Sequence, residues 1–213
     1  MVKTINHWIG GKEVAGKGSR KSAVFNPATG EQTGELVLAT TAELDAAVQV
    51  AQAAAPGWQA TTPLRRSRIL NAFLRILETR TKELAACISA EHGKVLSDAM
   101  GEVQRGMEVV EFATAAPSLL KGEYTENVGT KVDSWSTRQP LGVVAGITPF
   151  NFPAMVPMWM YPVAVAAGNT FILKPSERDP SAPMLIWELF QEAGFPAGVL
   201  NIVHGDKEIV DAI

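Results

Sequence analysis

An asparagine between two phenylalanines is the side chain best suited to chemistry. Asn151 lies in the stretch GITPFNFP, Gly146–Pro153, directly after an apolar run that predicts a strand. One interpretation is that Asn151 caps a helix beginning at Pro153, because an asparagine side chain can accept from free backbone N–H groups. The other is that its rigidly held N–H₂ group donates to an oxyanion that develops during a reaction. Both roles are possible together only if the side-chain geometry permits them.

A second polar segment, Lys174-Pro175-Ser176-Glu177, follows the next apolar run. By default these are solvated loop charges. In an open parallel sheet, however, ligands bind beyond the carboxyl ends of the strands. There Lys174 could donate to the hydroxyls of a nucleotide ribose and Glu177 could accept from them, and the carboxylate would favour NAD over NADP. The signal is weak by itself, because no G-x-G-x-x-G motif follows a predicted strand.

Two other reactive residue types have structural explanations. Arg105 lies on a predicted helix with Glu102 and Glu108 three residues to either side, which is typical of surface ion pairs. Cys87, the single cysteine, shares a helical face with apolar residues and is typical of a small core residue. The histidines and remaining carboxylates show no metal-ligand spacing.

Composition excludes several functional classes. Lys and Arg number 19 against 22 Asp and Glu, a net charge of −3 that provides no basic surface for nucleic acid or anionic membranes. One cysteine excludes an internal disulfide framework, and no targeting peptide is evident, so we expect a cytoplasmic protein. The uncharged stretch 139–173 is broken by prolines and glycines, so we expect no membrane span. A membrane-associated protein stays a rival interpretation of that stretch.

The first 121 residues read as strands followed by helices. Residues 6–40 alternate short apolar patches with turn signals, which predicts a strand or hairpin arm. The first expected helix begins with a capping box at Thr40–Glu43 and ends near Pro56. A second helix begins at Thr62–Pro63, and a further helix ends at Gly93. Another runs from Ser97–Asp98 to about Pro117.

The rest of the chain changes character. Residues 122–140 alternate polar and apolar side chains around a glycine turn, which predicts an antiparallel hairpin. Strands are then expected at 141–147, 170–173 and 200–203, with helices at 153–167 and 180–193. Near-continuous apolar strands separated by helices predict an α/β fold with a parallel sheet covered on both faces. The next helix has only begun at Ile213, so we expect a fragment.

The whole chain resembles the N-terminal part of aldehyde dehydrogenases, through FNPATGE, EHGK, PLGVVAGITPFNFP, GNTFILKPSE and EAGFPAGVLNIVHG. VQRGMEVVEFA and GITPFNFPAMVPMWMYPVAVAAGN look most like the CoA-acylating methylmalonate (malonate) semialdehyde dehydrogenases. The resemblance implies an incomplete Rossmann-type sheet. It assigns residues 1–121 to the arm and helices of an NAD-binding domain, 122–140 to an oligomerisation hairpin, and 141–213 to the first βαβαβ part, with the catalytic domain absent.

The resemblance also implies roles for individual residues. Asn151 matches the asparagine whose amide stabilises the oxyanion formed when a thiolate attacks an aldehyde. Arg105 matches an arginine associated with the carboxylate of the substrate. On the cofactor side, the matching residues are Thr148 and Phe150 beside NAD, Lys174 and Glu177 at its ribose, and Arg178.

The implied reaction begins with a cysteine thiolate adding to a semialdehyde. Hydride passes to NAD, and the acyl group is transferred to CoA with loss of carbon dioxide, which gives acetyl-CoA or propionyl-CoA. The family's catalytic cysteine lies downstream of Ile213, so we expect this chain alone to be inactive, and the complete protein to be a homodimer or homotetramer. A hydrolytic, non-acylating aldehyde dehydrogenase and a catalytically inactive relative remain alternatives.

Overall fold

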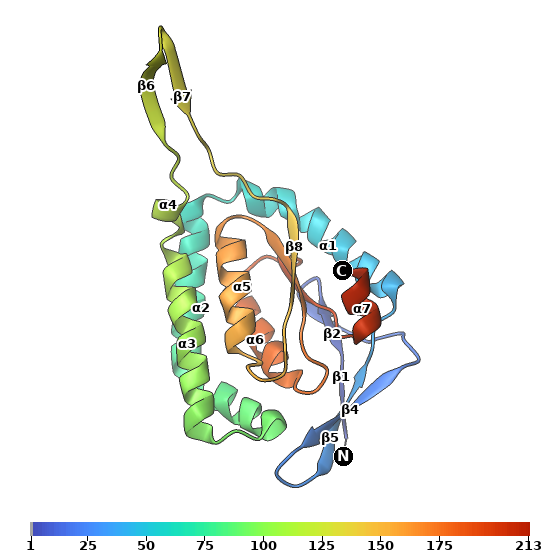
Figure 1. Cartoon of the computed structure of the whole chain (residues 1–213). Coiled ribbons are helices and arrows are strands. Elements are labelled where there is room, and N and C mark those ends of the chain that lie inside the picture. Colours follow the sequence, from blue (N-terminus) through green and yellow to red (C-terminus); the bar gives the residue numbers. More distant parts are fainter. Residues whose placement is uncertain (1) are drawn as a thin grey trace.

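The computed structural model, which describes residues 2–213, is built around a five-stranded sheet (Figure 1). Its strand order is β3 (Lys12–Val14), β2 (His7–Ile9), β10 (Leu200–Ile202), β9 (Thr170–Lys174) and β8 (Val143–Ile147). The last three strands pair in parallel, as predicted, and the N-terminal hairpin β2–β3 joins β10 in the antiparallel direction. The carboxyl ends of β8 and β9 therefore meet at one edge of the sheet.

A smaller sheet accompanies the main one. Strand β1 (Lys3–Ile5) pairs in parallel with β5 (Glu31–Val37), and β5 pairs in the antiparallel direction with β4 (Lys21–Asn26). The predicted N-terminal arm is thus confirmed as strands, but these are divided between two sheets. Residues 2–14 contribute to both of them.

Helices cover both faces of the main sheet, which confirms the predicted α/β class. Helix α1 (Thr41–Ala60) packs on one face with α7 (Lys207–Ala212) beside it, and α5 (Met155–Ala166) packs on the other. Strand β9 is buried throughout because its side chains alternate between these faces. Phe171 and Leu173 enter the larger core, whereas Ile172 enters the smaller core under α1.

The remaining helices form an outer layer. Helix α2 (Pro63–His92) packs against α3 (Leu96–Thr114) and α6 (Ser181–Glu192), and α3 also packs against α5. The short helix α4 (Ala116–Leu119) follows α3. This layer brings the end of α2 and the first turns of α3 beside the loop that leaves β8.

Several predicted helix limits need correction. The capping box at Thr40 is present, but α1 continues through Pro56 to Ala60, because Trp58 is buried and its Nε1 donates to the Val165 carbonyl at 3.0 Å. The helices expected to begin at Pro63 and to end at Gly93 are a single helix, α2. The N-cap of α3 is Val95, not Ser97.

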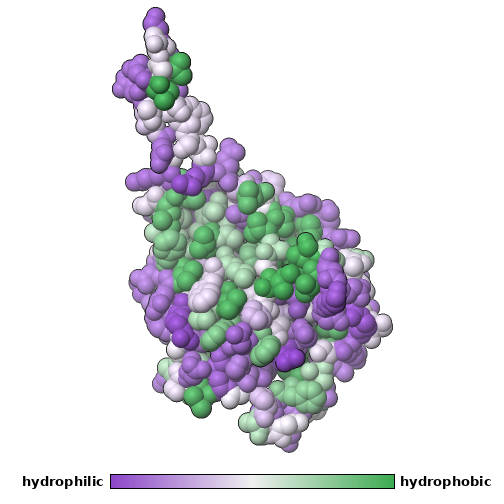
Figure 2. Space-filling view, viewed as in Figure 1, coloured by the Kyte–Doolittle hydropathy of each residue, from purple (hydrophilic) through white to green (hydrophobic). Residues whose placement is uncertain are grey.

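A hairpin extends away from the body of the molecule (Figure 1). Its strands are β6 (Tyr124–Gly129) and β7 (Val132–Trp135), and every residue of both strands is exposed. The antiparallel hairpin predicted within 122–140 is confirmed. Hydrophobic side chains also gather over β8 and α5 (Figure 2), among them Ile147, Trp159 and Val163. Within residues 2–213, no helix is both long and apolar enough to cross a membrane.

Candidate functional site

The loop that leaves β8, residues 148–154, lies beside the loop that leaves β9. The Thr148 N–H donates to the Lys174 carbonyl at 3.1 Å, which continues the pairing of the two strands by one residue. The Thr148 side chain is buried, and its hydroxyl has no hydrogen-bond partner among the described residues. A buried hydroxyl without a partner is costly, so this atom marks a place where a polar ligand group would be favourable.

Asn151 is exposed at the tip of this loop and does not cap α5. The carboxylate of Glu102 takes that place, because its Oε1 accepts from the N–H groups of Ala154 and Met155 at 2.8 and 3.1 Å. The prediction that the Asn151 side chain caps the helix is therefore wrong. Among the described residues its amide has no hydrogen-bond partner, so both N–H donors are free.

Lys174 and Glu177 form an ion pair at the end of β9, with Nζ and Oε2 3.1 Å apart. Lys174 is only 5% exposed, so it is not the solvated loop charge that the default interpretation assumes. Glu177 is partly exposed, so the carboxylate side of the ion pair faces solvent. A donor and an acceptor held together at a strand end can bind two neighbouring hydroxyl groups.

Arg178 and Phe150 join the two loops across the opening. The Arg178 guanidinium lies over the Phe150 ring, 4.8 Å from its centroid, a distance suited to a cation–π contact. The Phe150 ring is 47% exposed. The five residues predicted on the cofactor side thus lie close together, on the loops that leave β8 and β9 and at the last residue of β9: Thr148, Phe150, Lys174, Glu177 and Arg178.

Arg105 reaches the same loop from α3. Within the described residues it forms no ion pair with Glu102 or Glu108, so the expected surface ion pairs are not observed. Its guanidinium lies over the Phe152 ring, 5.7 Å from the centroid. An exposed guanidinium without a carboxylate partner remains available to bind an anionic group.

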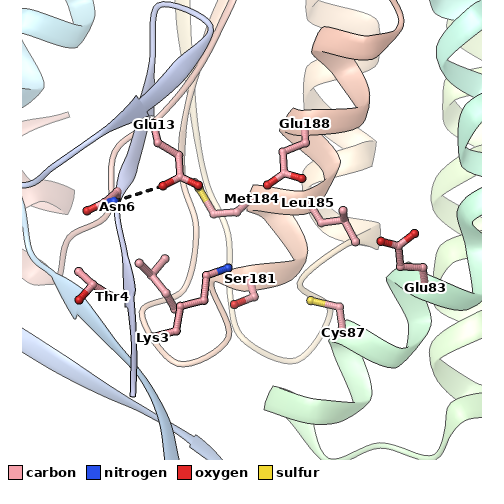
Figure 3. A pocket seen from close by; sticks show the side chains of 11 residues that line it. Lys3, Thr4, Asn6, Glu13, Glu83, Cys87, Ser181, Met184, Leu185 and Glu188 are labelled. Atoms are coloured by element: carbon pink, nitrogen blue, oxygen red, sulfur yellow. Dashed lines mark hydrogen bonds between the residues drawn. The ribbon is translucent and has the colours of Figure 1, made fainter. Parts of the chain in front are cut away.

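Cys87 lies away from these loops, in a pocket of about 280 Å³ between β1, α2 and α6 (Figure 3). Burial raises the pKa of its thiol to about 12, so the thiolate is scarce at neutral pH. The prediction that Cys87 is a structural residue agrees with this chemistry. Three glutamates and Lys3 surround the pocket, and residues 2–213 contain no group of three or more potential metal ligands.

Sequence reasoning missed the charged residues that lie behind the site. Lys94 and Glu102 form a buried ion pair 2.7 Å apart, with side chains 7% and 0% exposed. Asp179 is buried with neither carboxylate oxygen bonded, and burial raises its pKa to about 7. The signal for Lys94 was its place directly after the helix-ending Gly93, but its partners are distant in sequence.

Comparison with known proteins identifies the family. A model of the aldehyde dehydrogenase family matches residues 14–213. Malonate-semialdehyde dehydrogenase of Pseudomonas aeruginosa is 58% identical over 210 residues, which are 99% of this chain and 42% of that protein. Malonate-semialdehyde dehydrogenase 2 of Geobacillus thermodenitrificans is 51% identical over 212 residues, 100% of this chain and 44% of that protein. The chain thus spans less than half the length of these curated relatives.

Solved structures share the fold over the whole chain. Methylmalonate-semialdehyde dehydrogenase of Oceanimonas doudoroffii superposes with a TM-score of 0.96 at 55% identity, covering 99% of this chain and 43% of that one. A Sinorhizobium meliloti structure complexed with NAD, provisionally described as methylmalonate-semialdehyde dehydrogenase, gives a TM-score of 0.98 at 54% identity, covering 100% and 43%. From the family match, these likenesses and the loops at the strand ends together, the chain belongs to the aldehyde dehydrogenase family.

Proposed function

We propose that this chain is part of an NAD-dependent, CoA-acylating dehydrogenase of malonate semialdehyde or methylmalonate semialdehyde. The observation that carries the proposal is the free amide of Asn151. Asn151 lies at the carboxyl edge of the sheet in the loop that leaves β8, and its amide is not needed as a helix cap because Glu102, from α3, accepts from the first N–H groups of α5. An amide with both N–H donors unused can bind an oxyanion without first breaking another hydrogen bond.

The role of Asn151 is electrostatic. When a nucleophile adds to an aldehyde, negative charge grows on the carbonyl oxygen, and a donor fixed in advance stabilises that charge more than it stabilises the ground state. The nucleophilic cysteine would come from a part of the protein outside these 213 residues, because Cys87 is partly buried, lies away from Asn151 and is largely protonated.

The cofactor residues fit NAD on three grounds. The buried Thr148 hydroxyl has no partner within residues 2–213, Lys174 and Glu177 offer a donor and an acceptor, and Phe150 presents an exposed ring surface. We assign the ribose hydroxyls to Lys174 and Glu177, and a flanking position to Arg178. NAD, when bound, accepts the hydride released from the aldehyde carbon. The Glu177 carboxylate would repel a 2′-phosphate, which favours NAD over NADP.

Arg105 supports a substrate that carries a carboxylate. Its guanidinium is exposed and rests on Phe152, the neighbour of Asn151, so an anion bound by Arg105 would lie close to the oxyanion donor. A semialdehyde carries an aldehyde and a carboxylate a few bonds apart, which suits two such donors. Loss of that carboxylate as carbon dioxide and transfer of the acyl group to CoA complete the proposed reaction.

The test uses the complete protein that contains this chain, with malonate semialdehyde, NAD and CoA. We expect NADH formation that requires CoA and yields acetyl-CoA. Asn151→Asp keeps the shape of the side chain but removes its N–H donors, so kcat should fall about 100- to 1,000-fold. Asn71→Asp, the same change at an exposed position on α2, should leave kcat unchanged.

Other outcomes point to the alternatives. Turnover to a free acid without CoA would place the protein among the hydrolytic aldehyde dehydrogenases. No turnover of any short aldehyde by the complete protein would contradict the proposal and favour a catalytically inactive relative. Equal loss of activity in Asn71→Asp would show that the effect of Asn151→Asp is not specific.

We also propose that the complete protein is a homodimer or homotetramer that uses the β6–β7 hairpin. The hairpin exposes Tyr124, Val128, Val132 and Trp135, each more than half exposed. Aromatic and β-branched residues on an exposed two-stranded ribbon are unfavourable in water unless another surface covers them. A second copy of the chain is the partner that we assign.

A further inference from the structure

A buried ion pair stands directly behind the candidate oxyanion donor. Lys94 follows Gly93, which ends α2 in the left-handed conformation at φ 85°, and Glu102 lies near the start of α3. The Lys94 Nζ and the Glu102 Oε2 are 2.7 Å apart, with side chains 7% and 0% exposed. Two different helices therefore place opposite charges at one buried point.

Each member of the pair also holds the loop that carries Asn151. Glu102 Oε1 accepts from the N–H groups of Ala154 and Met155 at 2.8 and 3.1 Å. Lys94 Nζ donates to the backbone carbonyl of Asn151 itself at 3.0 Å. The backbone is thus fixed at the asparagine and again three residues later.

The ring of Phe152 lies within the same group of contacts. The Lys94 Nζ is 4.4 Å from its centroid, and Arg105 approaches the ring at 5.7 Å. Two cations near one aromatic ring limit the positions that the ring can take. The oxyanion donor and the proposed carboxylate-binding arginine are therefore held by one connected set of side chains.

Stability alone does not account for this pair. Burying two charges carries a desolvation penalty that their attraction only partly returns, so apolar residues of the same size often serve stability as well. Apolar residues could not replace two of its hydrogen-bonding functions. Lys94 donates to the Asn151 carbonyl, and Glu102 accepts from the first N–H groups of α5. Because Glu102 supplies that acceptor, the Asn151 amide is free to face the site.

We propose that Lys94 and Glu102 are positioning residues, which set the orientation of the Asn151 amide by holding the loop backbone at Asn151 and again at Ala154 and Met155. The inference rests on the proposed function, since it assigns a purpose to the orientation of that amide. Neither residue touches the substrate. Their effect should appear in kcat, where oxyanion stabilisation acts, more than in the KM for NAD.

The experiment compares Lys94→Met, Glu102→Gln and the double variant in the complete enzyme. Lys94→Met leaves a buried carboxylate without its counter-charge, so both kcat and the unfolding midpoint should fall. In the double variant no buried charge is left unpaired, and glutamine Oε1 can still accept from Ala154 and Met155. Its midpoint should return towards that of the wild type. Its kcat should stay about 10- to 100-fold low, because the donor to Asn151 is missing, with the KM for NAD within about threefold.

The matched control is Leu84→Ala, which removes a fully buried side chain of α2 outside the site. It should lower the unfolding midpoint and leave kcat within about twofold. Wild-type kcat in the double variant would overturn the proposal. A loss of kcat in Leu84→Ala as large as in Lys94→Met would overturn it as well, because lost stability alone would then explain the effect.

A second measurement separates this inference from the proposed reaction. If the wild-type enzyme does not oxidise the semialdehyde, the proposed function fails, but hydrogen exchange still reports on the loop. In Lys94→Met, amides of residues 148–156 should exchange at least about tenfold faster, while those of β10 stay unchanged. Unchanged exchange in the loop would overturn the positioning role regardless of activity.

Discussion

Asp179 is a buried carboxylate that directly follows the candidate cofactor residues Glu177 and Arg178. It is 2% exposed, and neither oxygen has a hydrogen-bond partner in the described chain. Burial, with smaller contributions from the nearby Glu91 and Glu102 carboxylates, raises its pKa from 3.8 to about 7, against the opposing effects of the Ser176 side chain and of Lys94. The folded protein therefore holds a proton on Asp179 at a pH where the unfolded chain has released it.

This difference gives Asp179 a defined pH dependence. Between about pH 4 and pH 7 the folded state binds more protons than the unfolded state, so the Asp179 contribution to stability falls as pH rises and its full penalty is present above pH 7. Asp179→Asn should raise the free energy of unfolding at pH 8 by about 1 to 4 kcal/mol and have little effect at pH 4. Urea unfolding at both pH values measures the difference.

The control for this prediction is Asp45→Asn, which removes the same charge at an exposed position of α1. It should change stability little at either pH. A gain in Asp179→Asn that is equal at pH 4 and pH 8 would show that packing, and not the proton, is responsible.

The residues behind the site show what the sequence could not reveal. Arg105 and Glu102 are three apart on one helix, which favoured a local ion pair. Glu102 instead binds Lys94, eight residues earlier, and the amide of Ala154, 52 residues later. A carboxylate has two oxygens and can serve partners from different elements, so helical spacing alone could not identify them. The place of Lys174 and Glu177 beside the loop that leaves β8 could be predicted, because they lie at the end of a strand.

At the level of elements, the end of α2 determines where Lys94 lies. Gly93 has a positive φ, and a Cβ at this position would lie 2.7 Å from the Pro27 Cγ. Gly93 therefore satisfies a conformational and a steric requirement together. The helix must end at this residue for the lysine that follows to turn inward.

Gly93→Ala should lower the free energy of unfolding by about 1 to 3 kcal/mol, because alanine resists the left-handed conformation and its methyl group crowds Pro27. Thermal or urea unfolding measures the change. Gly101→Ala on α3 is the matched control, since nothing lies within 4 Å of its added Cβ and the position is helical. It should raise stability by about 0.5 to 1 kcal/mol. Equal effects of the two substitutions would contradict this account.

Element boundaries were predictable wherever a local signal decides them. The capping box at Thr40 and the Thr62–Pro63 start are both present. The continuity of α2 was not predictable, because the polar run ETRTKE at 78–83 interrupts the apolar pattern. There the helix is supported by an i,i+3 ion pair between Arg80 and Glu83. The extension of α1 past Pro56 depends on Trp58 and Val165, a contact across the fold.

At the scale of the whole molecule, two surfaces lack a partner within residues 2–213. One is the β6–β7 hairpin, and the other is the hydrophobic area over β8 and α5 (Figure 2). On the second surface Ile147 is 41% exposed and Trp159 is 50% exposed. Exposed apolar side chains that gather on one face can mark an interaction surface.

The oligomerisation proposal predicts a change in mass when the hairpin becomes charged. Val128→Asp with Val132→Asp should convert the complete protein to a smaller species, because two carboxylates would be buried in the interface. Light scattering coupled to gel filtration measures the mass. Lys131→Ala, at the hairpin turn, should leave the mass unchanged. An unaltered mass in the double aspartate variant would exclude the hairpin as the interface.

The pairing of β2 with β10 also affects how the protein is made. Trp8 leaves the ribosome long before its strand partner Ile202, which follows it by 202 − 8 = 194 residues, and His204 then donates its N–H to His7 Nδ1 at 3.1 Å. At roughly 5–20 residues per second, synthesis separates the two strands by about ten seconds or more. During that interval the N-terminal hairpin has an open edge of backbone donors and acceptors. We therefore expect the nascent chain to depend on protection from chaperones until β10 emerges.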